Sequence, residues 1–325
     1  MGVLTSRGLG IVLHSYGLRL RKITVCRSLY KRRAAFYART DRGGVLIKPF
    51  HKSDRRLNLL STRIARLQRR GYRNMPGWYS TKKGRKWVKW GGRSFYVTRW
   101  IDGRPLRATF GDSRSLGEAL AKLHVRSRNV VRGPNLLLLG EIRFLRQSDA
   151  LFRRQLRLLQ KRRGPVGQWY REHGRQCISL ADQAWAALGR LENRRALQRE
   201  VQQPSLVHGD VTKPNVLVSR GRIYFVDWDC MGPGFTLLEL ARTLANTSDF
   251  SPDRMNATLH GYKKHRILQK EEKKIVSSLF QLPWEAWQAA KKATRHKVSP
   301  EFSVLQKTWS KRLTAVRWLK SWAER

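Results

Sequence analysis

Two polar residues in the middle of this chain have a spacing that phosphoryl transfer uses. In the stretch LVHGDVTKPNVLV, residues 206–218, Asp210 comes directly after His208 and Gly209. Asn215 follows five residues after Asp210. A carboxylate that orients an attacking hydroxyl and an amide that binds Mg²⁺ occur at this D-x-x-x-x-N spacing. The spacing indicates Asp210 as a catalytic base and Asn215 as a metal ligand, although an isolated His-Gly-Asp is also often a turn.

Two residues far from this stretch complete a set of phosphate and metal ligands. Asp227 follows the apolar run RIYFV, so the end of a short strand would hold its carboxylate at a cleft. Upstream, Lys48 ends the run VLIK, the position from which a strand lysine steadies the phosphates of ATP. Mg²⁺ prefers oxygen ligands, which Asn215 and Asp227 supply. Each residue alone has an ordinary explanation, but the four in this order predict a site for ATP and Mg²⁺.

Neighbouring residues are expected to support this site. His208 is expected to orient the loop backbone through a buried hydrogen bond and to leave the chemistry to Asp210. Lys213 is a candidate ligand for a phosphate, and a solvent-exposed lysine is an equally good interpretation.

The elements that must position these residues fall into two blocks. Before residue 100, β-branched and aromatic runs predict five strands, and an amphipathic helix runs from an N-cap at Ser53 to a stop at Gly71. From Ser115 the pattern is mostly helical. The expected strands are 23–31, 33–40, 45–50, 86–90 and 94–100; the expected later helices are 115–125, 141–162, 178–200 and several within 236–325, with a loop at 162–174.

This order predicts an α+β, bilobal, protein kinase-like fold. Residues 1–100 form a small antiparallel N-terminal lobe whose sheet covers the nucleotide, with one helix. Residues 101–325 form a larger, mainly helical lobe that carries the catalytic loop and the metal-binding strand end. A hinge is expected near residues 98–103.

The charge of the chain is extreme. Its 325 residues include 68 Lys and Arg against 22 Asp and Glu, a formal net charge of +46. Such a surface attracts polyanions, so non-specific nucleic-acid binding is a further hypothesis. Residues 77–100 interleave tryptophans with Lys and Arg, which could stack on single-stranded nucleic acid, although a β-meander with its tryptophans inward explains them better.

The cysteines, the apolar runs and the N-terminal residues indicate the cellular compartment to expect. Cys26, Cys177 and Cys230 have neither a zinc spacing nor a disulfide pattern, which favours a reducing compartment. No apolar run approaches the roughly 20 residues that a membrane span needs. The acid-free N-terminus faintly resembles a transit peptide, but synthesis in the cytoplasm is the expectation.

With these residues in hand, the chain resembles the aminoglycoside phosphotransferase and choline kinase-like superfamily. LVHGDVTKPNVLV resembles its catalytic loop, with Gly209 in place of the Arg of protein kinases, and FVDWD resembles its metal-binding strand end. LGEALAKLH at 116–124 is similar to the first helix of its C-terminal lobe. LLELARTL at 237–244 corresponds to a helix that usually carries Asp, which implies that Glu239 supports the loop.

Within that superfamily, the tail GYKKHRILQKEEKKIVSSLFQLPWEAWQAAKK, residues 261–292, resembles the CotS-type spore coat protein family. The resemblance implies ATP and Mg²⁺ binding and location in the spore coat of an endospore-forming bacterium. Its expected partners are coat proteins or anionic spore components, together with a small-molecule or protein acceptor. A polycationic aminoglycoside is an unfavourable acceptor for so basic a chain, whereas a phosphorylated, acidic or neutral one is easier to accommodate.

Two departures from the superfamily pattern leave the activity open. Asp54 is the only acid between Lys48 and Trp100, so the helix glutamate that would pair with Lys48 is absent or displaced to Asp54. The segment SLYKRR, residues 28–33, has no glycine where a phosphate-covering loop would lie. The hypotheses are therefore an ATP-dependent phosphotransferase, a weak or inactive kinase-like scaffold of the coat, and a polyanion-binding protein.

Overall fold

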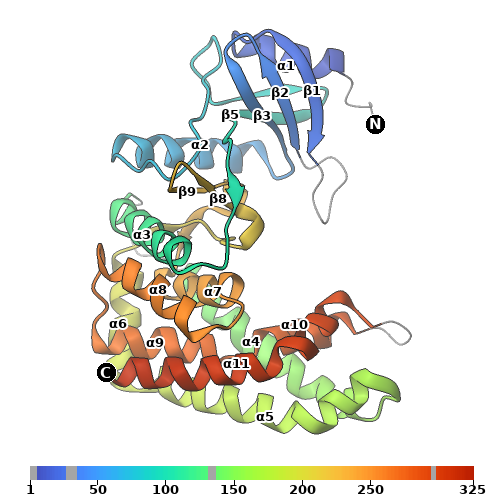
Figure 1. Cartoon of the computed structure of the whole chain (residues 1–325), viewed down its shortest axis with the longest axis vertical. Coiled ribbons are helices and arrows are strands. Elements are labelled where there is room, and N and C mark those ends of the chain that lie inside the picture. Colours follow the sequence, from blue (N-terminus) through green and yellow to red (C-terminus); the bar gives the residue numbers. More distant parts are fainter. Residues whose placement is uncertain (1–5, 27–34, 131–136, 294–297) are drawn as a thin grey trace. The chain divides into compact units, whose positions relative to one another are not determined.

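The computed structural model describes residues 6–26, 35–130, 137–293 and 298–325 (Figure 1). The chain forms two compact units: unit 1 comprises Met1–Pro105 and Pro214–Met231, and unit 2 comprises Leu106–Lys213 and Gly232–Arg325. A small antiparallel sheet in unit 1 and the many helices of unit 2 confirm the predicted α+β class. The predicted lobe boundary at residue 100 stays a prediction, and the units place Pro214–Met231 with the sheet.

The main sheet of unit 1 has the five strands that the sequence predicts, in the antiparallel order β1-β2-β3-β5-β4. Alternation along the strands gives it two different faces. The part of the first predicted strand beyond Cys26, and the segment SLYKRR, lie outside the described residues. The strands are β1 (Leu20–Cys26), β2 (Ala35–Thr40), β3 (Gly43–Phe50), β4 (Trp87–Trp90) and β5 (Arg93–Arg99).

One face of this sheet packs against a helix that the sequence analysis did not expect, α1 (Ser6–Ser15). Leu9, Val12 and Leu13 of α1 are buried in one core cluster with apolar side chains of β2, β3 and β5. Gly8 allows the close approach, since a Cβ there would lie 2.1 Å from the Trp90 ring. The first residues described are therefore part of the core of unit 1.

The other face packs against α2 (Asp54–Arg69), which begins as predicted, with the Ser53 hydroxyl accepting from the Arg56 N–H. Its apolar stripe is buried, as expected from its spacing. The Trp87 indole N–H donates to Asn58 of α2 at 2.7 Å. Because Trp87 and Lys48 both pair with Tyr96 in the sheet, Lys48 lies on this α2 face.

A second sheet of unit 1 holds the hairpin that ends at the predicted metal ligand. It has the order β6-β8-β9, with β6 (Arg104–Pro105), β8 (Val216–Ser219) and β9 (Arg222–Phe225). Asn74, in the segment after α2, ties this hairpin to the rest of unit 1. Its side-chain amide donates to the Ile223 carbonyl at 2.8 Å, and its own carbonyl accepts from the Phe225 N–H at 2.9 Å.

In its described residues, unit 2 is helical apart from one short antiparallel strand pair. The predicted loop at 162–174 is wrong, because Pro165 sits in the first turn of a helix that begins at Gly164, a position that proline tolerates. The elements are α3 (Phe110–Ser127), α4 (Leu137–Gln160), α5 (Gly164–Gly189), α6 (Leu191–Gln202), β7 (Ser205–Val207), β10 (Gly232–Gly234), α7 (Thr236–Thr247), α8 (Pro252–Lys263), α9 (Lys270–Gln281), α10 (Trp284–Lys292) and α11 (Pro300–Glu324).

Within unit 2, α3 and α8 approach each other at two glycines. A Cβ on Gly117 would lie 1.9 Å from the Thr258 carbonyl oxygen, and a Cβ on Gly261 would lie 1.9 Å from that of Arg114. Only glycine fits at either place. None of the helices in the described part of the chain combines the length and apolar character needed to cross a bilayer.

Candidate active site

In unit 1, Lys48 of β3 lies between two carboxylates at the end of the β8–β9 hairpin. Its ammonium group pairs with Asp227 and, at 3.1 Å, with Asp229. The Lys48 side chain is only 10% exposed, whereas that of Asp227 is 42% exposed. The structure therefore brings together two of the predicted ligands, the phosphate lysine and the metal-binding aspartate, and adds a second acid.

Tyr96 holds that second acid in place. The register of β3 and β5 sets Lys48 opposite Tyr96, and the Tyr96 hydroxyl donates to Asp229 at 2.6 Å. Burial raises the pKa of Tyr96 far above its ordinary value, and the neighbouring Asp229 charge raises it further. The phenol is thus a permanent donor. Neither Tyr96 nor Asp229 is predicted as a site residue from the sequence, although the second acid of DWD was a signal for Asp229.

Asn215 and Asp227 lie at the open end of the same hairpin. The pairing of Val216 with Phe225 is followed by a hydrogen bond from the Val226 N–H to the Asn215 carbonyl at 3.0 Å. Asp227 comes next and adopts φ 60° and ψ 65°, in the left-handed region that residues other than glycine rarely occupy. Such strain concentrates at functional positions.

Asn215 and Asp227 could supply part of the ligand set of a magnesium ion, with a nucleotide supplying further oxygen ligands. No group of three or more His, Cys, Asp or Glu side chains in the described residues could hold a metal alone. Asn215 and Asp227 offer hard oxygen donors, and the Asp227 carboxylate is accessible. Mg²⁺ is commonly held by one or two carboxylates together with water and substrate phosphates, so this partial donor set matches its chemistry.

The predicted catalytic loop is divided at the boundary between Lys213 and Pro214: residues 206–213, with Asp210, belong to unit 2, and residues 214–218, with Asn215, belong to unit 1. Gly209 has φ 81°, and its N–H donates to Glu239 of α7 at 2.7 Å. The Asp210 N–H donates to Nδ1 of the fully buried His208 at 3.3 Å. His208, Gly209 and Glu239, the residues predicted to support the loop, therefore all contact the loop or one another within unit 2.

Glu239 is itself fixed by a buried chain of hydrogen bonds. Its second oxygen bonds Nε2 of His124 at 2.8 Å, and Nδ1 of His124 bonds the Tyr262 hydroxyl at 2.7 Å. Burial acts to raise the pKa of Glu239, but the hydrogen bond and charge of His124, with the Gly209 N–H, bring it below its ordinary value. Glu239 is therefore ionised at neutral pH. Neither His124 nor Tyr262 was identified from the sequence.

Lys213, a candidate phosphate ligand, has an acidic partner here. Its ammonium group lies 2.5 Å from Asp249, which also pairs with Arg254 at 2.6 Å. Burial opposes ionisation of Asp249, yet hydrogen bonds from the two cations lower its pKa. A phosphate would have to replace Asp249, so this role of Lys213 stays a prediction.

The sequence predicts that the helix carboxylate that would pair with Lys48 is either absent or displaced to Asp54. Asp54 instead accepts from the Ser94 hydroxyl and pairs with Lys89 at 3.1 Å. Lys48 pairs with the hairpin acids, so α2 supplies it with no carboxylate in the described structure.

Comparison with known proteins agrees with the phosphotransferase family and kinase-like fold that the sequence predicts. The model of a family described as the phosphotransferase enzyme family matches residues 48–272. That match includes Lys48, the catalytic loop, the β8–β9 hairpin and α7.

Solved structures with the same fold include an aminoglycoside phosphotransferase from Alicyclobacillus acidocaldarius, with TM-score 0.82, 16% identity, and coverage of 100% of this chain and 98% of that chain. A spectinomycin phosphotransferase in complex with ADP and spectinomycin matches with TM-score 0.60 and 16% identity over 99% and 95%. An amicoumacin kinase in complex with AMP-PNP and Ca²⁺ matches with TM-score 0.56 and 14% identity over 91% and 88%. These likenesses confirm the predicted kinase-like fold.

Proposed function

From the premise that this chain belongs to the phosphotransferase enzyme family, we propose that it transfers the γ-phosphoryl group of ATP to a hydroxyl of an acceptor. The observation that carries the proposal is the ion pair of Lys48 with Asp227 and Asp229, which joins a strand lysine to the acids of a hairpin end. The complexes of similar kinases with ADP and with AMP-PNP support the proposal that this chain binds a nucleotide.

The proposed roles follow from the chemistry of each side chain. Asp210 takes the proton of the acceptor hydroxyl as its oxygen bonds to the γ-phosphorus, and the bond from that phosphorus to the oxygen of ADP breaks. Lys48 binds the phosphates, and Asn215 and Asp227 hold Mg²⁺. When bound, Mg²⁺ neutralises charge that develops on the phosphate oxygens.

We assign Asp229 the task that a helix glutamate has in protein kinases, which is to orient the lysine. Asp229 touches Lys48 at 3.1 Å and is fixed by the Tyr96 hydroxyl at 2.6 Å. Its side chain is 19% exposed, against 42% for Asp227. On binding of ATP and Mg²⁺, Lys48 would exchange Asp227 for phosphate oxygens and would keep Asp229.

A second candidate function is a kinase-like scaffold with weak nucleotide binding. It is favoured by the same ion pair, because Lys48 pairs with the carboxylate that should hold the metal. Under either function we propose synthesis in the cytoplasm and association with the coat of bacterial spores. That proposal rests on the resemblance of residues 261–292 to CotS-type coat proteins and on the net charge of +46, which suits anionic spore components.

The acceptor is proposed to be a small molecule with a hydroxyl group, by likeness to the spectinomycin phosphotransferase and to an aminopropanol kinase of the same fold. A neutral, acidic or phosphorylated acceptor suits the basic chain better than a polycation.

Calorimetric titration of ATP with and without Mg²⁺ tests the proposal. We expect Mg²⁺-dependent binding by the native chain and an affinity lower by about a hundredfold in Asp227→Asn, because a metal ligand is lost. Asp253→Asn, an exposed acid in the first turn of α8, is the matched control and should bind like the native chain. Absence of Mg²⁺-dependent heat in the native chain would refute the enzyme and leave the scaffold.

A further inference from the structure

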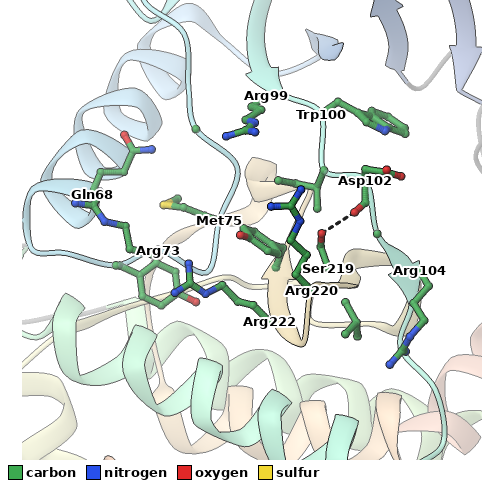
Figure 2. Close-up of a pocket in the computed structure, with 16 residues that line it drawn as sticks. Gln68, Arg73, Met75, Arg99, Trp100, Asp102, Arg104, Ser219, Arg220 and Arg222 are labelled. Carbon is green, nitrogen blue, oxygen red and sulfur yellow. Dashed lines mark hydrogen bonds between the residues drawn. The ribbon is translucent and has the colours of Figure 1, made fainter. Parts of the chain in front are cut away.

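Unit 1 contains a cavity away from Lys48 and Asp227. It has a volume of about 930 Å³ and is lined by the segment after α2, the connector from β5 to β6, and the β8–β9 turn (Figure 2). Neither Lys48 nor Asp227 is among its lining residues. Pockets of roughly 300–1,000 Å³ are the size that small ligands occupy.

The lining of this cavity is rich in guanidinium groups. Five arginines border it, against one carboxylate, Asp102; the arginines are Arg73, Arg99, Arg104, Arg220 and Arg222. Arg104 donates to the Pro105 carbonyl at 3.1 Å, so only the other four are considered as ligands for an anion. In the described part of the chain, no carboxylate pairs with the guanidinium groups of these four arginines, and all four are exposed.

The walls that present these arginines are fixed to one another. The Ser219 hydroxyl of β8 donates to the Asp102 carbonyl of the connector at 2.6 Å, the bond drawn in Figure 2. Gly103 lies so close to β8 that a Cβ there would be 3.0 Å from the Val218 carbonyl oxygen. A ligand would therefore meet a largely preformed arrangement of charge, which lowers the cost of binding.

Arg220 occupies a backbone position that does not suit arginine. It and Gly221 form a two-residue hairpin loop with φ values of 47° and 72°, both in the left-handed region of a type I′ turn. Asn, Asp or Gly normally fill the first position of that turn, because a longer side chain strains the backbone. The turn places a long cation at the cavity at some cost in stability, as strained residues at ligand sites do.

We propose that this cavity binds a small ligand that carries at least two phosphate groups. Arginine forks bind phosphate oxygens through paired, charge-assisted hydrogen bonds, and several unpaired forks around one cavity suit clustered phosphates better than a single anion. The ligand is either an inorganic oligophosphate or a phosphorylated metabolite, which share this chemistry. The site is separate from the proposed nucleotide site and does not depend on the proposed function.

Calorimetric titration of the full chain with tripolyphosphate and with a sugar bisphosphate, in the absence of divalent cations, tests the proposal. We expect saturable binding of at least one probe, weakened at least about tenfold in the Arg99→Gln, Arg222→Gln double variant, because hydrogen bonds to a charged group are lost. The control is the double variant Arg55→Gln, Arg69→Gln, which removes equal charge from exposed positions of α2. It should bind within about twofold of the native chain.

The variant Arg220→Asn distinguishes a loss of ligand binding from a loss of folding stability. Asparagine suits the left-handed position, so this variant should melt at a higher temperature than the native chain and yet bind the probe about fivefold more weakly. Lys48→Met should leave this binding unchanged. Equal losses in the two double variants would overturn the proposal, as would loss in Lys48→Met alone, or binding of a single-stranded oligonucleotide but of neither phosphate probe.

Discussion

The two acid clusters of this chain differ in how firmly they are held. In unit 1, Asp227 pairs with Lys48 but leaves 42% of its side chain exposed. In unit 2, Glu239 is 6% exposed and bonds both the Gly209 N–H and His124. An accessible carboxylate can exchange its partner for a ligand, whereas a buried one cannot leave its partners without a large penalty.

The comparison separates binding from stability. The unit 1 cluster has the properties of a ligand site, since charges near solvent contribute little to folding. The unit 2 cluster has those of a support, because a buried carboxylate bonded to both the Gly209 N–H and His124 determines where the loop backbone lies. Substitutions in the two clusters should therefore change different measurements.

The largest expected effect is on stability. Glu239→Ala leaves the Gly209 N–H and the His124 ring without their shared acceptor, so it should lower the free energy of unfolding by about 3–5 kcal/mol. Asp227→Ala, its counterpart in unit 1, should lower it by less than about 1 kcal/mol. Urea denaturation of both variants measures the difference. Similar losses would show that the clusters do not differ in the way we infer.

A smaller effect is expected on the pH dependence of the free energy of unfolding. The pKa of Glu239 in the folded chain lies below its ordinary value of 4.5, so its contribution to stability is complete above that pH and is lost as the pH falls through the lowered value. The native chain should therefore exceed Glu239→Gln in stability at neutral pH, and the gap should narrow below about pH 4.5. Urea midpoints between pH 7 and pH 3 test this. If the stability difference between the two proteins did not change with pH, groups other than Glu239 would be responsible for the loss of stability in acid.

The smallest effect concerns the proposed orientation of Lys48. Tyr96→Phe removes the hydrogen bond to Asp229 and should weaken Mg²⁺-ATP binding about fivefold, which corresponds to about 1 kcal/mol. Asp54→Asn is the control, because Asp54 pairs with Lys89 and Ser94 rather than with Lys48. It should change the affinity less than about twofold. The reverse ranking, measured by calorimetry, would restore Asp54 as the partner of Lys48.

Local signals in the sequence predicted much of the fold. The five strands and their turns depend on nearby residues, and Ser53 caps α2 as its position predicts. The element α1 was missed because its apolar residues have a partner only once the sheet exists, and because two glycines lower its helix propensity. The predicted loop at 162–174 failed since Gly164 and Pro165 begin a helix rather than interrupt one.

The candidate site could be predicted only in part, for a similar reason. Spacing along the chain predicts Asp210 and Asn215 as site residues, and the strand context predicts Lys48 and Asp227. The orientation of Lys48 by Asp229 and Tyr96 depends on the register between β3 and β5 and on the hairpin end, which no single segment encodes. His124 and Tyr262 reach Glu239 only through the packing of three helices.

The contact of α3 with α8 makes part of unit 2 sensitive to substitutions that touch no ligand. Gly117 and Gly261 let the two helix backbones meet, and the same helices carry His124 and Tyr262, which hold Glu239 and through it Gly209. A genetic screen for loss of function would therefore recover substitutions at both glycines. Their phenotypes would resemble those of substitutions in the predicted catalytic loop, although neither glycine is a predicted site residue.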